Sequence, residues 1–393
     1  MKIAFVIPWF GRGIPGGAEH LCRELAYNLL KRGLPVEVLT TCVKEFQSNW
    51  NQDFYPGGRS QDDGLTVHRF KVRPGDHRVF DAINYKLMQG WKVSAQEELI
   101  FMKEIINSPD LYRYIKDHRQ EYYFFFIPYM FGTTYWGSKV CPERSFLIPC
   151  LHDEGYARMD IMKDMFQKVK GVLFNSRPEY ELAHRLYDLN KVKTIVLGVG
   201  MDMDIVGDPG RFRQKYQLEG NFILYVGRKD ATKGTLQLID YFCHYQVQPR
   251  NQPGLKLVLI GKGEVPIPQG LENKIIDLGY ITQQDKYDAY AAALCLCQPS
   301  VNESFSYVLM EAWLCHTPVL INGRCAVTKD HCLIGQGGLY YEDYFEFQEC
   351  LNYLINNKVL RERLAARGRD YVRANHGWDI IIQRFQNEVL SED

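Results

Sequence analysis

Short apolar runs alternate with amphipathic stretches along most of this chain. Residues 2–7 form an apolar run of strand length, 18–31 place leucines at helical spacing, and 36–41 form a second apolar run. The same order returns later, with an apolar run at 222–226 followed by a helical pattern at 235–245. Strands that alternate with helices predict an α/β fold with parallel sheets, because parallel strands need a crossover connection.

The same patterns predict further elements in both halves of the chain. Strands are expected at 67–72, 146–151, 171–175, 192–197, 255–260, 275–278, 293–297 and 317–321, and helices at 87–107, 111–118, 283–293, 345–356 and 360–375, with a last helix that starts at 376–378. Residues 44–119 are rich in aromatic side chains, which stack on sugar rings or form core, and the sequence leaves both readings open.

Composition narrows the class of protein. The 393 residues suggest two or three domains, and 46% hydrophobic residues are ample for buried cores. The 47 basic and 47 acidic residues balance, so no nucleic-acid partner is expected. The eleven cysteines include no Cys-x-x-Cys pair, and no apolar run approaches the ~20 residues of a membrane span. We expect a cytoplasmic protein with reduced thiols and no transmembrane segment, with contact at the inner membrane face left open.

Two carboxylates bracket a predicted turn in the second half. Pro299 ends the apolar run, Glu303 lies in the turn, and Glu311 lies two turns into the helix that Ser304 or Ser306 would cap. The start of a helix offers free backbone N–H groups to an anion, while carboxylates accept from hydroxyl groups. A nucleotide-sugar diphosphate fits both features, although a solvated glutamate pair on an ordinary helix is the simpler reading.

A basic turn follows the predicted strand at 222–226. Arg228 and Lys233 stand five residues apart where that strand leads into the next helix. A guanidinium group offers a planar fork of donors to phosphate oxygens, and an ammonium group offers a compact charge. The pair therefore indicates a phosphate site that needs no metal ion, whereas each cation alone would be an ordinary solvated side chain.

The stretch Pro299-Ser300, Glu303-Ser304-Phe305-Ser306, Glu311-Ala312, Thr317-Pro318-Val319 resembles the glutamate–seven residues–glutamate signature of retaining glycosyltransferases. More narrowly, it is similar to family 4 glycosyltransferases of the GT-B fold. The resemblance implies two Rossmann-like domains with parallel sheets that face each other across a cleft. That family has glycine where Ser304, Ser306 and His316 stand, so His316 is expected in a left-handed or otherwise unusual conformation after the helix.

The resemblance also implies roles for individual residues, and His152-Asp153 stands where open α/β sheets place ligands, after a predicted strand. The implied set is His152, Asp153 and Glu303 for catalysis; Gly16, Gly17, Arg228, Lys233, Ser306 and Tyr307 for the donor phosphates; His152, Glu303, Ser304 and Phe305 for the donor sugar; and Gly261, Gly279, Tyr280, Ile281 and Glu311 for the ribose and base. The implied domains are 1–197 on the acceptor side and 198–375 for the donor, with a helix at 376–393 that packs back on the first.

The implied reaction moves a hexose from UDP-glucose or a related UDP-hexose to a hydroxyl of a glycan or lipid-linked acceptor, in polysaccharide or glycoconjugate biosynthesis. The configuration at the anomeric carbon is expected to be retained, and no cofactor or metal ion is expected to be needed. Asp202-x-Asp204 is read as an interdomain hinge rather than a metal site. Alternatives are a GT-B epimerase or phosphorylase, a carbohydrate-binding protein without turnover, and an NAD-dependent oxidoreductase. Gly11, Gly13 and Gly16 have the dinucleotide spacing, but Pro15 interrupts it.

Overall fold

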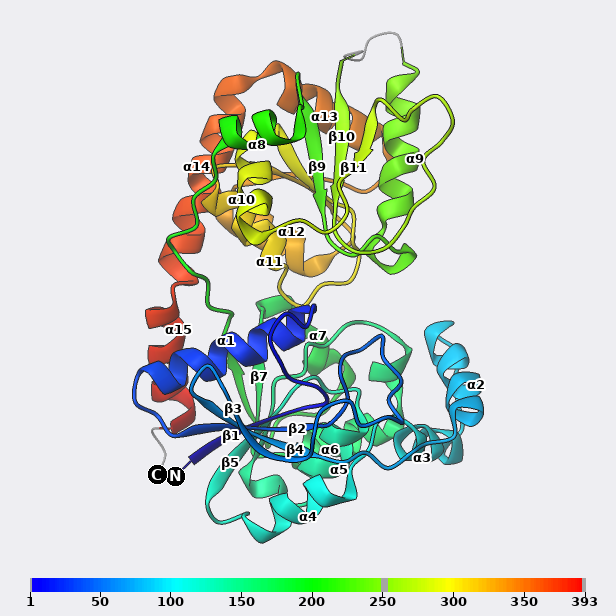
Figure 1. Cartoon of the computed structure of the whole chain (residues 1–393), viewed down its shortest axis with the longest axis vertical. Helices are drawn as coiled ribbons and strands as arrows, with labels where there is room; N and C mark the ends of the chain where they lie inside the picture. The colour runs from blue at the N-terminus through cyan, green and yellow to red at the C-terminus, as the bar shows by residue number, and fades with distance from the viewer. Residues whose placement is uncertain (1, 249–253, 391–393) are drawn as a thin grey trace. The chain divides into compact units, whose positions relative to one another are not determined.

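The computed structural model describes residues 2–248 and 254–390, and the chain divides into two compact units. The first unit comprises Met1–Gly200 together with Ile381–Asp393, and the second comprises Met201–Ile380 (Figure 1). The sequence placed the two changes of domain at 197/198 and 375/376, three and five residues before the divisions in the structure.

The first unit contains one sheet and the helices that cover it. Its strands are β1 (Lys2–Ile7), β2 (Val36–Thr41), β3 (Gly58–Asp62), β4 (Leu65–Phe70), β5 (Tyr122–Phe126), β6 (Ser145–Leu147), β7 (Gly171–Phe174) and β8 (Lys193–Val196). Its helices are α1 (Gly17–Lys31), α2 (His77–Met88), α3 (Ala95–Glu104), α4 (Pro109–Asp117), α5 (Gly132–Ser138), α6 (Asp160–Lys168) and α7 (Arg177–Leu186), with the 3-10 turns η1 (Pro142–Arg144) and η2 (Gly155–Arg158). Helix α15 (Trp378–Phe385) begins in the second unit and ends in the first, where the π-helical turn η4 (Gln386–Leu390) follows it.

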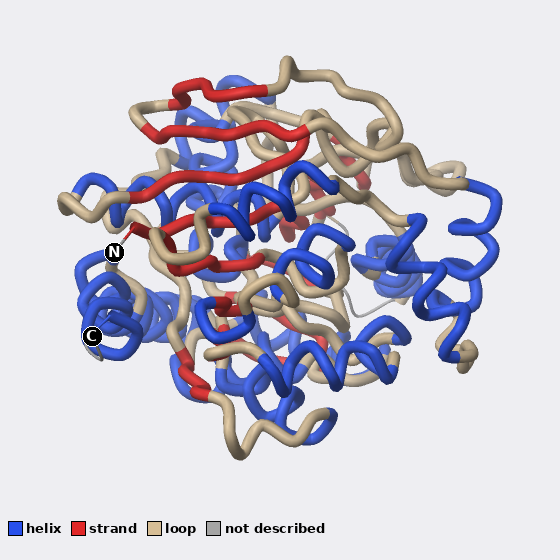
Figure 2. The backbone as a smooth tube through the Cα atoms, turned by 90° about the horizontal axis from the view of Figure 1, so that it is seen from below, coloured by secondary structure: helices blue, strands red, loops and turns tan. Residues whose placement is uncertain are grey.

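The strands of the first sheet lie in the order β3-β4-β2-β1-β5-β6-β7-β8. Figure 2 draws the strands in red and the helices in blue. Neighbouring strands are parallel, as expected, except for the antiparallel hairpin β3–β4 at one end of the sheet. Alternate side chains of a strand point to opposite faces. Accordingly Phe125 packs on Phe385 of α15 with ring centroids 5.2 Å apart, whereas its neighbours Phe124 and Phe126 belong to the core on the other face.

The helix predicted at 87–107 is wrong, because two helices occupy this region with a break between them. Helix α2 ends at Met88, Gly90 adopts a positive φ of 70°, and Ser94 starts α3. Ser94 and Glu97 form a capping box, in which each side chain accepts from the backbone N–H of the other residue. A helix start of this kind competes with continuation of the preceding helix, so the apolar periodicity alone misjudged the boundary.

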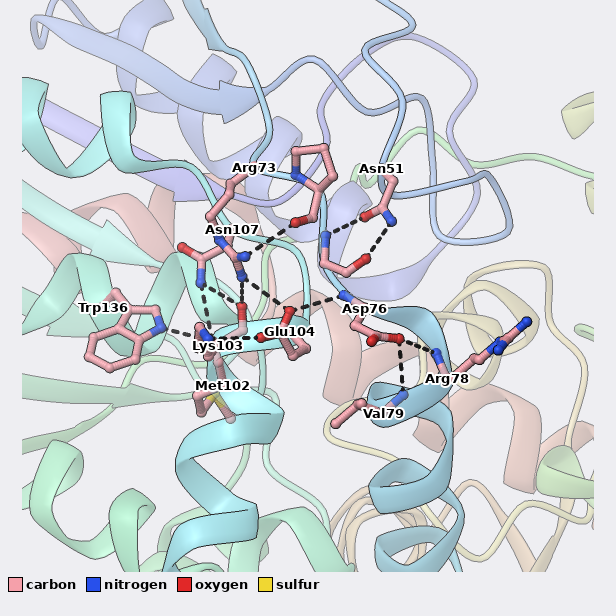
Figure 3. A network of polar contacts seen from close by, with 12 residues as sticks. Asn51, Arg73, Asp76, Arg78, Val79, Met102, Lys103, Glu104, Asn107 and Trp136 are labelled. Carbon is pink, nitrogen blue, oxygen red and sulfur yellow. Dashed lines mark hydrogen bonds and ion pairs between the residues drawn. The ribbon is translucent and has the colours of Figure 1, made fainter.

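A polar network attaches the start of α2 to the end of α3 (Figure 3). Asn51 donates to the carbonyl of Gly75 and accepts from its N–H, both at 2.8 Å. The N–H of Asp76 donates to Glu104 at 3.0 Å, and the Asp76 side chain then caps α2. The network holds the irregular segment before α2, for which the sequence predicted no structure.

The second unit contains a sheet in which all pairings are parallel, in the order β11-β10-β9-β12-β13-β14. Its strands are β9 (Phe222–Val226), β10 (Lys256–Ile260), β11 (Ile275–Asp277), β12 (Cys295–Gln298), β13 (Val319–Asn322) and β14 (Gly338–Tyr341). Its helices are α8 (Pro209–Tyr216), the 3-10 turn η3 (Ala231–Lys233), α9 (Thr235–Gln246), α10 (Gln283–Ala292), α11 (Tyr307–Leu314), α12 (Ala326–Gly335), α13 (Tyr344–Asn356) and α14 (Lys358–Asn375). Because the strands are parallel, the loops that follow them share one edge of the sheet.

Helix α8 was not predicted from the sequence, although local and distant groups both support it. Asp208 caps its first turn, and Pro209 occupies a position where a missing N–H costs nothing. Arg211 and Lys215 then form ion pairs with Asp288 and Asp285 of α10, at 2.5 and 2.7 Å.

Within residues 2–248 and 254–390, no helix combines the length and the apolar character that crossing a bilayer requires.

Candidate active site

The basic turn after β9 holds three cations in different surroundings. Lys229 is buried, and its Nζ lies 2.5 and 2.6 Å from the carboxylate oxygens of Asp277 at the end of β11. Arg228 is half exposed, with its Nε 3.4 Å from Asp230. Lys233 ends the 3-10 turn η3, immediately before α9. The predicted Arg228 and Lys233 are therefore at the sheet edge with accessible side chains, while Lys229, which the sequence did not single out, ties two loops together.

The loops after β9, β10 and β11 cross at very short range. The N–H of Gly261 donates to the carbonyl of Gly279 at 2.8 Å, and Gly261 has a φ of 138°. A Cβ at Gly261 would stand 1.8 Å from the carbonyl oxygen of Gly227, so no other residue fits there without moving the backbone. Beside this crossing Tyr280 is 73% exposed, and the Nζ of Lys262 lies 5.8 Å from its ring centroid. An exposed aromatic ring beside tightly packed loops suits a flat heterocycle.

The acidic loop between β12 and α11 meets the basic turn directly. The carboxylate of Glu303 accepts from Lys233 Nζ at 2.8 Å, although the two residues are seventy positions apart. Gln298 at the end of β12 lies 3.4 Å from both Glu303 and the Ser306 hydroxyl. The structure thus brings together a residue predicted for the phosphates and a residue predicted for the sugar.

The start of α11 holds Ser306 where the sequence resemblance implies glycine. Ser306 occupies the N-cap position, as predicted, but its φ of 80° is left-handed and its side chain makes no capping hydrogen bond, which corrects the predicted cap. Ser304 is partly exposed, whereas the Phe305 ring is buried and packs edge-on against His331 and His376. Only the backbone of Phe305 is therefore available to a ligand on the exposed side of the loop.

The far end of α11 confirms one conformational prediction. His316 follows the helix with a φ of 60°, the left-handed conformation that the sequence resemblance led us to expect there. Its imidazole contacts the Arg369 guanidinium of α14. Burial, together with the charges of Arg369 and Arg373, lowers the pKa of His316, so this side chain stays neutral at pH 7.

Glu311 is the second of the two predicted carboxylates, and α10 supplies its partners. Lys286 Nζ lies 2.7 Å from one carboxylate oxygen, and the hydroxyl of Tyr290 donates to the other at 2.9 Å. Lys286 and Tyr290 are four residues apart and therefore share one face of α10. The sequence did not single out either residue, because nothing in the local pattern of α10 indicates a contact with α11.

In the first unit, Gly16 and Gly17 lie at the start of α1. Gly16 is the N-cap residue with a φ of 145°, and Gly17 is the first residue of the helix. A Cβ at Gly16 would stand 1.9 Å from Oε2 of Glu19, whose other carboxylate oxygen, Oε1, accepts from the Trp9 indole N–H at 2.5 Å. The missing side chain leaves the backbone at this helix start close to the surface.

The loop after β6 carries the predicted His152 and Asp153. The strand ends at Leu147, four residues earlier than expected, and His152 Nδ1 lies 3.9 Å from Glu154. The Tyr129 hydroxyl donates to Glu154 at 2.9 Å, and burial raises the pKa of Glu154 to about 7. Asp153 is exposed and contacts Arg158. The histidine is therefore accompanied by a titratable acid, Glu154, that the sequence reading missed.

Asp202 and Asp204 lie in the turn that follows Met201, where the chain enters the second unit. The N–H of Met201 donates to the carbonyl of His376 at 2.7 Å, close to the point where the chain leaves that unit. The described residues contain no group of three or more His, Cys, Asp and Glu side chains arranged to hold a metal ion.

Two α/β units, each built on a largely parallel sheet, match the GT-B fold of glycosyltransferases of known structure. The solved structure of sucrose-phosphate synthase from Thermosynechococcus elongatus superposes with a TM-score of 0.72 at 17% identity, covering 98% of each chain. HepE from Anabaena, solved with UDP and glucose, gives a TM-score of 0.71 at 18% identity over the whole of both chains. Residues 209–371, which make up most of the second unit, match the family described as glycosyl transferases group 1.

Curated relatives agree with this family. A D-inositol 3-phosphate glycosyltransferase from Stackebrandtia nassauensis is 22% identical over an alignment 401 positions long, which covers 92% of this chain and 84% of the relative. The glycosyltransferase 1 domain-containing protein 1 of Xenopus tropicalis is 26% identical over 180 residues, or 43% of this chain. The aligned part is 50% of that relative's length, so the likeness to it spans only about half of the relative.

Proposed function

We propose that this protein is a retaining hexosyltransferase that takes its sugar from a UDP-hexose and transfers it to a hydroxyl of a glycan or lipid-linked acceptor. The donor would bind mainly at the sheet edge of the second unit. Arg228, Lys233 and the amides at the start of α11 would hold the diphosphate, Glu303 the hexose, Glu311 the ribose and the loop at Tyr280 the base.

The contact between Lys233 and Glu303 carries this proposal. In a nucleotide sugar the phosphate that leaves is bonded directly to the sugar ring, so a cation for one and a carboxylate for the other must be neighbours. The 2.8 Å separation of the two side chains meets that requirement. The start of α11, which follows the loop of Glu303, adds the positive end of a helix dipole.

The difficult step in such a transfer is departure of UDP. The bond between the anomeric carbon and the β-phosphate oxygen breaks, and the acceptor oxygen bonds to the same face of that carbon. The acceptor proton passes to the leaving phosphate, so no separate base is consumed. Arg228 and Lys233 would stabilise the charge that develops on the phosphate, which is the largest contribution expected from fixed groups in such a site.

Two observations support a UDP-sugar as the donor: a protein of the same fold binds one, and the loops near Tyr280 suit a small base. HepE, which has the same fold, was solved in complex with UDP-glucose. In this chain the loops after β10 and β11 present Tyr280 and close-packed backbone, a setting for a small base recognised through backbone groups. Calorimetric titration with UDP, GDP and ADP, followed by hydrolysis assays with the matching sugar nucleotides, tests the choice. Tight binding of GDP or ADP in place of UDP would refute it.

Turnover tests the wider proposal. The Arg228→Ala variant should bind UDP at least about tenfold more weakly, since it removes a charged phosphate donor. An exposed arginine away from this edge, Arg113 of α4, supplies the matched control Arg113→Ala. Product analysis by NMR should show retention at the anomeric carbon. An inverted product, or a protein that binds no nucleotide, would contradict the proposal.

A further inference from the structure

A buried carboxylate joins two strand ends beside His152. Glu179 lies in the first turn of α7 and is 1% exposed. One of its oxygens accepts from the N–H of Leu151 at 2.6 Å, and the other accepts from the N–H of Asn175 at 2.6 Å. The N–H of Ser176, the N-cap residue of α7, also bonds to this carboxylate. A single side chain therefore links the loop after β6 with the turn after β7.

This side chain occupies an unfavourable place for an acid. Burial raises the pKa of Glu179 to about 8, against the opposing effect of its three backbone hydrogen bonds. Helix α7 needs no buried acid for its own sake, because the Ser176 hydroxyl already accepts from the Glu179 N–H as a helix cap. The contact with Leu151, 28 residues away, is the one that helix capping does not explain.

The loop that Glu179 holds is strained. Cys150 has a φ of 52°, a left-handed conformation that a residue with a side chain adopts at a cost of roughly 1–2 kcal/mol. The Asn175 side-chain amide nitrogen lies 3.5 Å from the Cys150 sulfur. The backbone N–H of the same Asn175 donates to the Glu179 carboxylate. Strained residues persist where the surrounding structure overdetermines them, and they concentrate at functional sites.

We propose that Glu179 is a positioning residue, which fixes the strained turn 150–152 and thereby sets the place of the His152 imidazole. The proposal rests on the proposed transfer function, with His152 in the catalytic role that the sequence resemblance implies. The peptide N–H that Glu179 binds belongs to the residue directly before His152, so a shift of this hydrogen bond moves the histidine backbone. Groups that must be placed within about 0.5 Å depend on such supporting contacts.

The chain offers a matched control in Glu98. This residue of α3 is 4% exposed, and its two carboxylate oxygens accept from the N–H groups of Asp160 and Ile161 at 3.0 and 3.1 Å. It therefore has the same chemistry as Glu179: a buried acid that binds two backbone amides of another segment. Glu98 holds the start of α6 and adjoins none of the residues assigned to the site.

The experiment compares Glu179→Gln, Glu179→Asp and Glu98→Gln in the full chain. In Glu179→Gln and Glu98→Gln the new amide N–H₂ faces a backbone N–H donor, so both variants should lose stability. Glu179→Asp keeps the carboxylic acid but shortens the side chain. We expect kcat to fall about 10–100-fold in both Glu179 variants, with the donor KM changed less than about threefold, because a small misplacement at a reacting centre lowers kcat. Glu98→Gln should keep kcat within about twofold of the wild type.

A second readout does not depend on turnover. The His152 imidazole resonances should shift in Glu179→Asp and stay in place in Glu98→Gln. Unchanged resonances and unchanged kcat in folded Glu179→Asp would overturn the inference, as would an equal loss of kcat in Glu98→Gln. If the wild type turned over no sugar nucleotide, the proposed function would fail, and the resonances would still decide whether Glu179 places His152.

Discussion

The ion pair between Lys233 and Glu303 leads to a prediction that is contrary to simple intuition. The proposed function gives Lys233 to the donor phosphates, yet without a donor its ammonium group is bound to Glu303 at 2.8 Å. A ligand that brings phosphate without sugar, such as UDP, must therefore compete with Glu303 for this cation. We predict that Glu303→Gln binds UDP more tightly than the wild type does, while it loses sugar transfer.

The size of this effect follows from the geometry. Two unit charges 2.8 Å apart attract by about 6 kcal/mol at an effective dielectric constant of about 20. Desolvation and side-chain ordering remove most of this energy, and the side chains are 27% and 12% exposed, between the fully exposed and fully buried cases. A net pair energy of about 1–2 kcal/mol remains, so UDP affinity should rise about 5–30-fold.

Isothermal titration calorimetry of four proteins measures the effect: the wild type, Glu303→Gln, Lys233→Met and the double variant. Lys233→Met should weaken UDP binding, and in the double variant the gain from Glu303→Gln should disappear, because no ammonium group is left to release. Raising the salt concentration should reduce the gain, since partly exposed charges are screened.

Two results would refute the reasoning. Weaker UDP binding by Glu303→Gln would mean that the carboxylate helps to hold the nucleotide rather than competing for Lys233. If Glu303→Gln raised UDP affinity equally in the wild type and in the Lys233→Met background, Glu303 would act on UDP through general charge repulsion and not through its ion pair with Lys233.

Three further predictions concern stability and metal dependence. Ser306→Gly should raise the Tm by about 2–4 °C, because glycine relieves left-handed strain of roughly 1–2 kcal/mol. Part of this gain is offset because glycine makes the unfolded chain more flexible. An unchanged or lower Tm in a thermal melt would contradict this prediction. Glu154 keeps its proton to about pH 7 when folded but only to about pH 4.5 when unfolded, so its contribution to stability falls by at most about 3 kcal/mol as the pH rises between these values. Denaturant titrations at pH 5 and pH 8 should therefore show Glu154→Gln gaining stability relative to the wild type at the higher pH, and a constant difference would refute the assigned cause. Finally, since Arg228 and Lys233 supply the positive charge, a chelator should leave turnover within about twofold of its starting rate, and loss of activity restored by Mg²⁺ would disprove this.

The local pattern of the chain was enough for much of the second unit. The strand predicted at 222–226 has those bounds in the structure, and the helix that follows it differs by a single residue. The basic turn and the start of α11 lie at strand ends, as their positions between apolar runs indicated. The left-handed His316 was also predictable, because a glycine position occupied by another residue keeps its backbone conformation when the helix must end there.

The first unit was harder to predict for physical reasons. The break between α2 and α3 depends on a cap at Ser94, which apolar periodicity does not report. In the sequence Glu179 stands three residues after Ser176, the spacing of a capping box, and this signal could have drawn attention to it. Its reach to Leu151, however, could not be read from that spacing.

By itself the sequence determined the alternation of strands and helices, the parallel sheets that follow from it, and the chemistry of the turns after the strands. These properties depend on near neighbours along the chain, where periodicity and turn residues act. The tertiary structure alone decided which side chains meet: Lys233 with Glu303, Lys286 and Tyr290 with Glu311, and Glu179 with the loop of His152. Crossover helices separate these partners by tens of residues, and only the packing of parallel strands side by side brings their ends to one edge.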